Sequence, residues 1–299
     1  MKKAFFVIII VSYNPGKRLF DTLESVKRQN FDDYRILIKD GLSTDGSIEK
    51  LKSEYELGGR IRLVEGCDNG IYHAMNIAIS HVYECFEDDT TIDKVKKLKA
   101  GESPSYVFFL NCGDVFSDEN VLKNVHDSIV SRNRREGTTL PAIFYGDIYD
   151  SQTKTRVASN PQIDDFACYR NVPSHQACFY DERLIYKNPF DLKYKVRADY
   201  EQFLRCFYKE KAETCYIPII IADYEGGGYS DQNRKISELE RKEIIKMYLP
   251  ASKIRKYDFI RVITLAGLRT FLANNKITAG VYNSLKEFAY SIKGSVKEK

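Results

Sequence analysis

Phe5-Phe-Val-Ile-Ile-Ile-Val11 is an unbroken apolar run near the start of the chain, and the stretch Ser12-Tyr-Asn14 follows it at once. A short apolar run bounded in this way is typical of a strand that is buried on both faces. The pair Lys2-Lys3 ahead of the run imitates a signal peptide, but no small-residue cleavage site follows. We therefore expect residues 5–11 to form the first strand of a parallel sheet.

Strand-like segments then alternate with segments in which apolar residues recur at helical spacing. This order predicts an α/β fold: a Rossmann-like, mostly parallel sheet flanked by helices. Residues 86–105 are polar and charged, which predicts a surface insertion between a helix and a strand. The further expected strands cover residues 35–39, 61–64, 107–110 and 143–145, and the expected helices lie around 19–26, 48–55 and 71–82.

Composition excludes several classes of protein. The 299 residues carry a formal net charge of +4, which is too small to indicate a nucleic-acid partner, and we expect none. No apolar run approaches the ~18 residues of a membrane-spanning helix. Seven cysteines without a Cys-x-x-Cys pair suggest reduced thiols in a cytosolic protein. Four histidines without paired spacing make a zinc site improbable.

The charge is concentrated in the last fifty residues. Ten Lys or Arg and three Asp or Glu follow residue 249, a balance of +7, while the preceding residues total −3. Residues 250–299 are therefore expected to be a basic amphipathic helical tail, whose natural partner is an anionic membrane surface. The alternative is packing on the rest of the chain or on a second subunit. Its apolar positions are Ile260, Ile263, Leu268, Phe271, Leu272, Val281, Leu285, Phe288 and Ile292.

Polar residues follow the ends of four expected strands. They are Ser12-Tyr-Asn14, Asp40, Asp68-Asn-Gly70 and Asn111-Cys-Gly-Asp114. Each of these taken alone is compatible with turn chemistry. Because ligands of open parallel sheets bind at the carboxyl ends of the strands, four such stretches together indicate a binding site.

Two common phosphate-binding loops are absent from the sequence. No Gly-x-Gly-x-x-Gly follows the first strand, and no Gly-x-x-x-x-Gly-Lys-Ser/Thr occurs, which argues against a dinucleotide dehydrogenase and a P-loop NTPase. Bound phosphates therefore need another source of positive charge. A Mg²⁺ or Mn²⁺ ion held by a carboxylate such as Asp114 would supply it.

Taken in order, these elements resemble family 2 glycosyltransferases of the GT-A fold, in the bacterial subgroup that builds surface polysaccharides. The resemblance covers roughly residues 4–230, so that residues 1–249 form the expected GT-A domain and the tail lies outside it. The motifs are Val11–Asn14, Lys39–Gly46, Asp68–Asn76, Phe109–Asp114, Tyr145–Asp147, His175–Gln176, Ala198–Glu201 and Gly226–Ser230.

The resemblance implies a donor site. Tyr13 would lie against the nucleotide base and Asn14 would shape that pocket. Asp40 would read the base by accepting the imide N–H of uracil, which makes a UDP-sugar the expected donor. Asp68 and Asn111 would also bind the nucleotide-sugar.

It also implies a metal ligand and a catalytic base. Asp114 matches the metal-binding end of the family's Asp-x-Asp element, although the earlier carboxylates are absent from Asn111-Cys-Gly-Asp114. Asp199 matches the base that deprotonates the acceptor hydroxyl, which implies inversion at the anomeric carbon. Without the resemblance, Asp199 would be interpreted as the ion-pair partner of Arg197 or Lys195.

Three further segments belong to the resemblance. His175 and Gln176 are either contacts to the donor phosphates or acceptor, or ordinary loop residues. Asp147 would line the acceptor side, and Gly226–Gly228 would be a loop that closes over the donor or a simple turn.

The sequence thus predicts an inverting glycosyltransferase that acts on a glycan or polyprenyl-linked acceptor, in the cytoplasm or on the inner face of the plasma membrane. One alternative is a non-catalytic nucleotide-sugar-binding protein of the same fold. The other is a sugar nucleotidyltransferase, which would need a Gly-rich basic loop where only Gly16-Lys-Arg18 stands.

Overall fold

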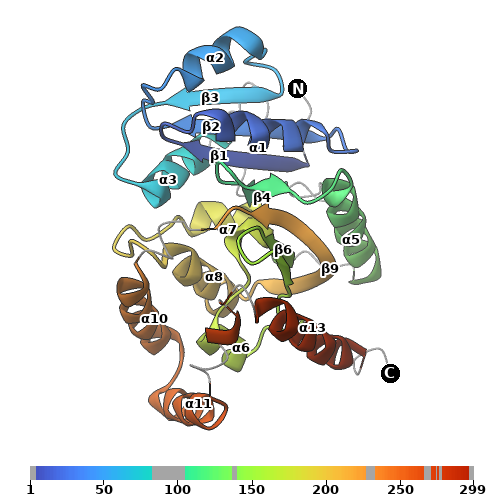
Figure 1. Ribbon diagram of the computed structural model, residues 1–299, viewed down its shortest axis with the longest axis vertical. Coiled ribbons are helices and arrows are strands. Elements are labelled where there is room, and N and C mark those ends of the chain that lie inside the picture. The colour runs from blue at the N-terminus through green and yellow to red at the C-terminus, as the bar shows by residue number, and fades with distance from the viewer. Residues whose placement is uncertain are drawn as a thin grey trace.

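The computed structural model describes residues 5–82, 105–136, 140–226, 233–265, 271–273, 275 and 278–295. It confirms the α/β fold, with one curled sheet and helices on both faces (Figure 1). The strands are β1 (Phe6–Ser12), β2 (Tyr34–Asp40), β3 (Ile61–Glu65), β4 (Tyr106–Phe109), β5 (Val115–Phe116), β6 (Ala142–Asp150), β7 (Thr155–Val157), β8 (Cys178–Asp181) and β9 (Glu213–Tyr224).

Helices connect and cover these strands. The α-helices are α1 (Lys17–Lys27), α2 (Ser47–Glu54), α3 (Ile71–His81), α5 (Val121–Glu136), α6 (Asp165–Arg170), α7 (Glu182–Lys187), α8 (Ala198–Tyr208), α10 (Arg234–Tyr248), α11 (Ala251–Ile263) and α13 (Ala279–Ser295), and η2 (His175–Ala177) is a 3₁₀ turn. The expected insertion at residues 86–105 lies outside the described residues, except for Ser105.

The first half of the sheet is parallel, as the sequence predicts. Its strands lie in the order β3-β2-β1-β4, and all three of these pairs are parallel. Every residue of β1 is buried. Its side chains alternate between two cores, because successive residues of a strand point to opposite faces. Val7 and Ile9 enter the core with α3, whereas Phe6 and Ile8 enter the core with α1.

The second half of the sheet is mixed. The expected fifth strand is part of β6, but β8 lies between β6 and β4 and runs antiparallel to both. β9 runs parallel to β6, so the first four strands, β6 and β9 share one direction. Because β8 runs backwards, the turn η2 that precedes it lies at the carboxyl end of β4. This reversal brings His175 and Gln176 to the expected site.

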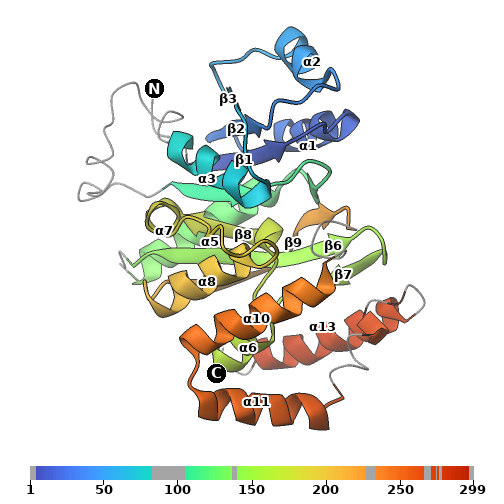
Figure 2. The same cartoon turned by 90° about the vertical axis from the view of Figure 1, so that its left-hand side faces the viewer.

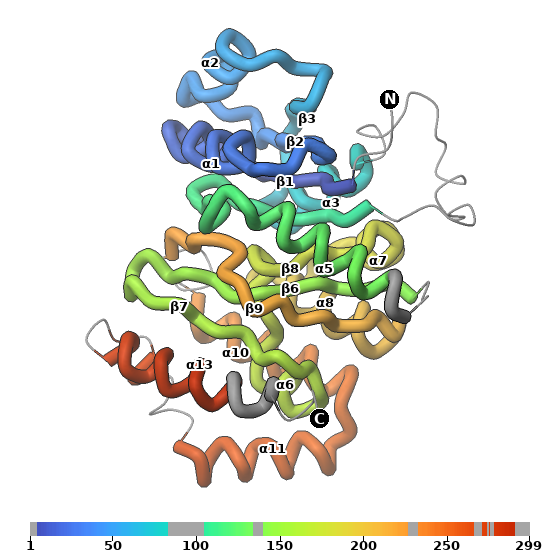
Figure 3. The backbone as a smooth tube through the Cα atoms, turned by 90° about the vertical axis from the view of Figure 1, so that its right-hand side faces the viewer, coloured from blue at the N-terminus to red at the C-terminus, as the bar shows by residue number. Residues whose placement is uncertain are grey.

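The tail helices pack on the chain with one side only. Tyr257 of α11 contacts Phe166 and Tyr169 of α6, and Glu287 of α13 accepts a 2.6 Å hydrogen bond from Arg156. Figures 2 and 3 show α11 and α13 at the end of the molecule farthest from α2 and β3. Leu268 lies outside the described residues. Within the described residues, no helix is both long and apolar enough to span a bilayer.

Candidate active site

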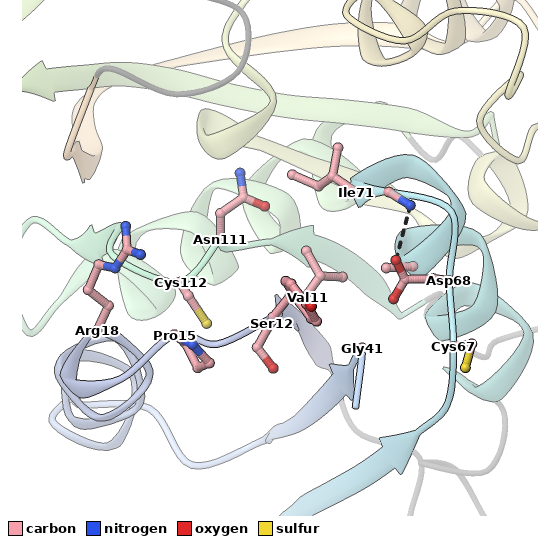
Figure 4. Close-up of a pocket in the computed structure, with 13 residues that line it drawn as sticks. Val11, Ser12, Pro15, Arg18, Gly41, Cys67, Asp68, Ile71, Asn111 and Cys112 are labelled. Atoms are coloured by element: carbon pink, nitrogen blue, oxygen red, sulfur yellow. Dashed lines mark hydrogen bonds between the residues drawn. The ribbon is translucent and has the colours of Figure 1, made fainter. Parts of the chain in front are cut away.

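A cavity of about 570 Å³ opens at the carboxyl ends of β1, β2 and β4. Figure 4 shows that side chains from these strand ends and from the loop before α3 surround it. Three of the expected site residues line it, namely Tyr13, Asp68 and Asn111, whereas Asn14, Asp40 and Asp114 do not. Its lining residues are Val11, Ser12, Tyr13, Pro15, Arg18, Gly41, Cys67, Asp68, Gly70, Ile71, Ala74, Asn111 and Cys112.

Tyr13 presents an aromatic face at the rim of the cavity. Its side chain is 70% exposed, which is unusual for an aromatic residue and leaves the ring free to stack on a ligand. Gly41 permits this arrangement. A Cβ atom at Gly41 would lie 3.2 Å from the Tyr13 ring and 3.0 Å from Asp68 Oδ2, so a side chain there would push both residues away.

Asp40 is not presented to the cavity, contrary to its expected role as the base reader. The residue is fully buried, and its carboxylate accepts hydrogen bonds from Ser12 Oγ at 2.8 Å, Ser43 Oγ at 2.6 Å and Ser43 N at 2.7 Å. The structure therefore uses Asp40 to hold the loop between β2 and α2 against β1. The sequence could not show this, because a strand-end aspartate can face either the ligand or its own loop.

Asn14 performs a similar structural task. Its backbone lies in the left-handed region at φ 46°, its N–H donates to Ser43 Oγ, and its Oδ1 accepts from Thr44 N at 2.8 Å. Asn14 thus fixes the same loop and shapes the cavity rim indirectly.

Asp68 is the carboxylate that lines the cavity. Its Oδ2 accepts a 2.9 Å hydrogen bond from Lys39 Nζ, and its Oδ1 accepts from Gly70 N. Lys39 is fully buried and also donates to the carbonyls of Asp40 and Gly66, both at 2.8 Å. Sequence reasoning missed Lys39, although a lysine inside an apolar strand is a signal of a buried ion pair.

Asp114 follows the lining residues Asn111 and Cys112 and is almost completely buried. Its Oδ1 accepts from Glu225 N at 3.0 Å and its Oδ2 from Gln176 Nε2 at 3.3 Å. Burial raises the pKa of Asp114 to about 6, and the neighbouring Glu225 carboxylate adds to this effect. A nearby cation would favour the ionised form of this carboxylate, which burial disfavours.

The residues around Asp114 fit a cation that is shared with a ligand. Within the described residues, no group of three His, Cys, Asp or Glu could hold a metal ion without help. Mg²⁺ usually binds one or two carboxylates and completes its shell with water and substrate phosphates. Asp114 and Glu225 can supply that part. Glu225 was not predicted, and of Gly226–Gly228 only Gly226 lies within the described residues.

Arg18 adds positive charge to the same side of the cavity. Its guanidinium lies 3.5 Å from Glu225 Oε2, and both side chains are more than half exposed. Gly113 allows this contact, since a Cβ atom there would lie 2.3 Å from Glu225 Oε2. Arg18 was noted in the sequence only as part of a poor phosphate loop.

Asp199 stands in the first turn of α8, with 27% of its side chain exposed. Its Oδ1 lies 2.9 Å from the Tyr72 hydroxyl and its Oδ2 lies 3.3 Å from His175 Nδ1. Burial opposes ionisation, but the hydrogen bond from His175, together with the charge of Arg197, holds the pKa of Asp199 below its usual value. Arg197 itself donates to Ser237 and Asn171.

The turn η2 connects the predicted site residues. His175 Nε2 lies 3.3 Å from Asn111 Nδ2 at the cavity wall, while its Nδ1 faces Asp199. The next residue, Gln176, contacts Asp114. One short turn therefore contacts the cavity wall, the expected base and the expected metal ligand.

Asp147, which was expected on the acceptor side, does not line the cavity. The residue is fully buried, with its Oδ2 bound by Arg156 Nε at 2.7 Å and its Oδ1 by Ser159 N at 2.7 Å. Tyr216 donates to the same carboxylate. These partners satisfy the group, so its role is structural.

Comparisons with known proteins agree with this geometry. Residues 7–84 match the model of Glycosyl transferase family 2. The chain is 28% identical over 234 residues to the PGL/p-HBAD biosynthesis glycosyltransferases of Mycobacterium tuberculosis (strain ATCC 25177 / H37Ra) and Mycobacterium bovis (strain BCG / Pasteur 1173P2). Each alignment covers 77% of this chain and 81% of the relative.

Two solved structures share the fold. S. aureus TarS 1-349 in complex with UDP aligns with a TM-score of 0.55 and 14% identity, over 88% of this chain and 73% of that one. The mannosyltransferase PcManGT from Pyrobaculum calidifontis, in complex with GDP-Man and Mn²⁺, aligns with a TM-score of 0.53 and 13% identity, over 99% and 87%. The sheet, the family match over residues 7–84 and the named relatives together show that this chain is similar to family 2 glycosyltransferases and has the GT-A fold.

Proposed function

We propose that the chain is an inverting glycosyltransferase that moves a sugar from UDP to a hydroxyl of a glycan or lipid-linked acceptor in cell-surface polysaccharide or glycolipid synthesis. One observation carries the proposal: the cavity and Asp199 are joined through Asn111 and His175. A donor site and an ionised carboxylate are the two parts that inverting transfer requires.

The donor base is assigned to Tyr13 and Asp68. The exposed Tyr13 ring offers a stacking surface, and each Asp68 oxygen keeps a lone pair beyond its present partner. A carboxylate accepts the imide N–H of uracil but faces an acceptor nitrogen in cytosine, so it favours UDP. The UDP complex of TarS, which shares the fold, is consistent with this choice.

The diphosphate is assigned to Arg18 and to a divalent cation held by Asp114 and Glu225. When bound, Mg²⁺ or Mn²⁺ would neutralise charge on the diphosphate leaving group. The guanidinium of Arg18 can donate to phosphate oxygens once it leaves Glu225, a contact that is long at 3.5 Å.

Asp199 acts on the acceptor. The acceptor hydroxyl oxygen forms a bond to the anomeric carbon while its proton passes to an Asp199 oxygen. The bond between the anomeric carbon and the diphosphate oxygen breaks, and its electron pair leaves with UDP. One displacement from the face opposite the diphosphate inverts the anomeric centre.

The tail helices indicate the cellular surface at which the enzyme would bind its acceptor. The outer sides of α11 and α13 leave six apolar side chains between 61% and 74% exposed, and Arg255 and Lys256 are exposed beside them. We assign this surface, called the tail face below, to the anionic inner face of the plasma membrane. The names of the mycobacterial relatives, which refer to glycolipid synthesis, support a lipid-linked acceptor. The apolar residues of the tail face are Phe259, Val262, Ile263, Val281, Leu285 and Phe288.

Product analysis tests the function directly. We expect a panel of UDP-sugars, offered with Mn²⁺ and a lipid-linked glycan extract, to yield UDP and a glycosylated acceptor. Pyrophosphate would instead identify a nucleotidyltransferase, and donor binding without any product would identify a binding protein. Asp199→Asn should keep UDP binding and lose at least ~10²-fold in kcat.

The cation is tested separately by calorimetry. Mn²⁺ should tighten UDP binding to the wild-type chain and to Asp199→Asn, and EDTA should reverse the effect. Asp114→Asn should bind UDP weakly and ignore both additions. Equal binding with and without Mn²⁺ in the wild-type chain would remove the cation from the proposal.

A further inference from the structure

His175 stands between the donor cavity and Asp199 but does not line the cavity. We propose that His175 is a positioning residue, which holds the Asp199 carboxylate ionised and directed at the acceptor, and that Asn111 selects the imidazole tautomer that does so. This inference rests on the proposed function, because it takes Asp199 as the base.

Hydrogen bonding fixes the tautomer. Asn111 Nδ2 is a donor, so His175 Nε2, which lies 3.3 Å away, must be the bare nitrogen. The ring proton then sits on Nδ1, which faces Asp199 Oδ2 at 3.3 Å and donates to it. Asn111 Oδ1 is buried and has no hydrogen-bond partner among the described residues. Turning the amide over would make Oδ1 the acceptor of an Nε2–H, and Nδ1 could then still donate to Asp199 only if the ring carried a second proton.

A neutral imidazole suits a carboxylate that must accept a proton. A donated N–H favours the ionised carboxylate, whereas a full positive charge at the same distance would lower its basicity further. By selecting the neutral imidazole with its proton on Nδ1, Asn111 favours an ionised Asp199. That carboxylate remains basic enough to take the proton of the acceptor hydroxyl. In other sites too, a hydrogen bond at one imidazole nitrogen fixes the ring orientation and the tautomer that the other nitrogen presents.

Other groups face Asp199 as well. The Tyr72 hydroxyl of α3 shares its hydrogen between Asp199 Oδ1 and the Val196 carbonyl, at 2.9 Å each. Arg197 precedes α8, and its charge also lowers the pKa of Asp199. Burial, with a smaller contribution from the Asp199 charge, raises the pKa values of Cys178 and Tyr180 of β8, so both are neutral neighbours. Among these groups, the hydrogen bond from His175 gives the largest lowering of the Asp199 pKa.

Three variants separate positioning from mere packing. His175→Ala removes the donor, and His175→Asn places an amide nitrogen where Nδ1 stood. Tyr72→Phe is the matched control, because it removes a hydrogen bond from the other Asp199 oxygen. Each is examined by UDP calorimetry, by the pH profile of kcat, and by carboxyl-carbon NMR of the Asp199 titration without any substrate.

We expect His175→Ala to bind UDP as the wild-type chain does, because the residue does not line the cavity. Its kcat should fall roughly 10-fold, less than on removal of the base itself. The acid limb of kcat and the Asp199 titration should both move to higher pH. His175→Asn should restore both toward wild type, and Tyr72→Phe should move the titration less than His175→Ala.

Two outcomes would overturn the inference. An Asp199 titration that is the same in wild type, His175→Ala and His175→Asn would show that the imidazole does not act on the carboxylate. Lost UDP binding in His175→Ala would make it a donor contact. A wild-type chain without transferase activity, whose Asp199 titration still responds to His175→Ala, would defeat the proposed function and leave the contact itself supported.

Discussion

Asp40 and Asp68 show how two carboxylates at neighbouring strand ends come to have different tasks. Both follow strands, but Asp40 accepts two hydrogen bonds from Ser43 in its own loop and one from Ser12 at the end of β1, whereas Asp68 accepts one from buried Lys39 and lines the cavity. Sequence spacing places both at the site. It cannot reveal which of them Ser43 will satisfy, because that depends on the path of the loop.

Base selectivity tests this division between the two carboxylates. In Asp68→Asn the amide oxygen can still accept from Lys39, whereas the amide nitrogen takes the place of the oxygen that accepts from Gly70 N and cannot accept the imide N–H of the base. We expect UDP binding to weaken about tenfold, the value of one hydrogen bond of ~1.4 kcal/mol, and the preference for UDP over CDP to shrink. Calorimetry with both nucleotides measures this.

Asp40→Asn serves as the comparison. It should lower the thermal stability, because a buried acceptor of three hydrogen bonds is disturbed, while the UDP/CDP ratio stays near wild type. If Asp40→Asn alone abolished the preference, the base reader would be Asp40 after all.

At the level of elements, the loop before α8 is held by a residue far along the chain. Glu240 of α10 accepts hydrogen bonds from three successive backbone N–H groups, those of Lys195 at 2.8 Å, Val196 at 3.0 Å and Arg197 at 2.9 Å. Two residues later stands Asp199. The helix α10 thus fixes the position from which the base acts.

Glu240→Ala should therefore lower kcat roughly 10-fold without changing the Kd for UDP, since misplacement of a catalytic group by even 1 Å is costly. Glu243→Ala is the matched control. Glu243 lies one turn along the same helix and pairs with exposed Lys193, so its loss should leave kcat unchanged. Equal effects of the two substitutions would mean that α10 acts only through general stability.

The elements also differ in how well the sequence predicts them. The strands β1 to β4 were predicted because each is a short, mostly apolar segment that is followed by polar residues. β8 has only four residues and no alternation, and β9 contains Pro218, which usually marks an edge or irregular strand. The pairing of β6 with β9 shifts register near Gly146, where a Cβ atom would lie 2.6 Å from Ile219 O. Such long-range pairing leaves no local pattern.

For the whole molecule, the contact between α13 and the sheet depends on pH. Burial lowers the pKa of Lys286 to about 8, with Arg170 adding to the effect and Asp147 opposing it. Lys286 donates to the Ala158 carbonyl at 2.6 Å. Because the packed state binds the proton less well than the open state, packing strengthens as pH rises through about 8 toward the ordinary lysine pKa of ~10.4.

Hydrogen exchange of α13, corrected for its intrinsic pH dependence, should therefore show fewer openings at pH 9 than at pH 7. Lys286→Met, which keeps the apolar stem without the charge, should remove this difference. If the protection of wild-type α13 is constant across this pH range, protonation of Lys286 does not weaken the packing of the helix.

The tail face is expected to bind anionic membranes, because its exposed apolar side chains belong to a tail that carries a charge of +7. Each basic residue near an anionic bilayer contributes ~1 kcal/mol, and salt screens this attraction beyond ~10 Å at 0.1 M. Burial of the apolar side chains adds a part that salt does not weaken. Sedimentation with phosphatidylglycerol vesicles should therefore show binding that falls with salt but does not vanish.

The two contributions can be separated by variants that leave the packed side of the tail intact. Arg255→Glu with Lys256→Glu should remove most of the salt-sensitive part, and Leu285→Ser with Phe288→Ser should remove most of the remainder. Glu54→Ser at the opposite end of the molecule should change nothing. If these tail variants bind vesicles as the wild-type chain does, the lipid contact lies elsewhere. If the wild-type chain ignores vesicles at low salt and sediments as a dimer, the tail face is instead a contact between two copies of the chain.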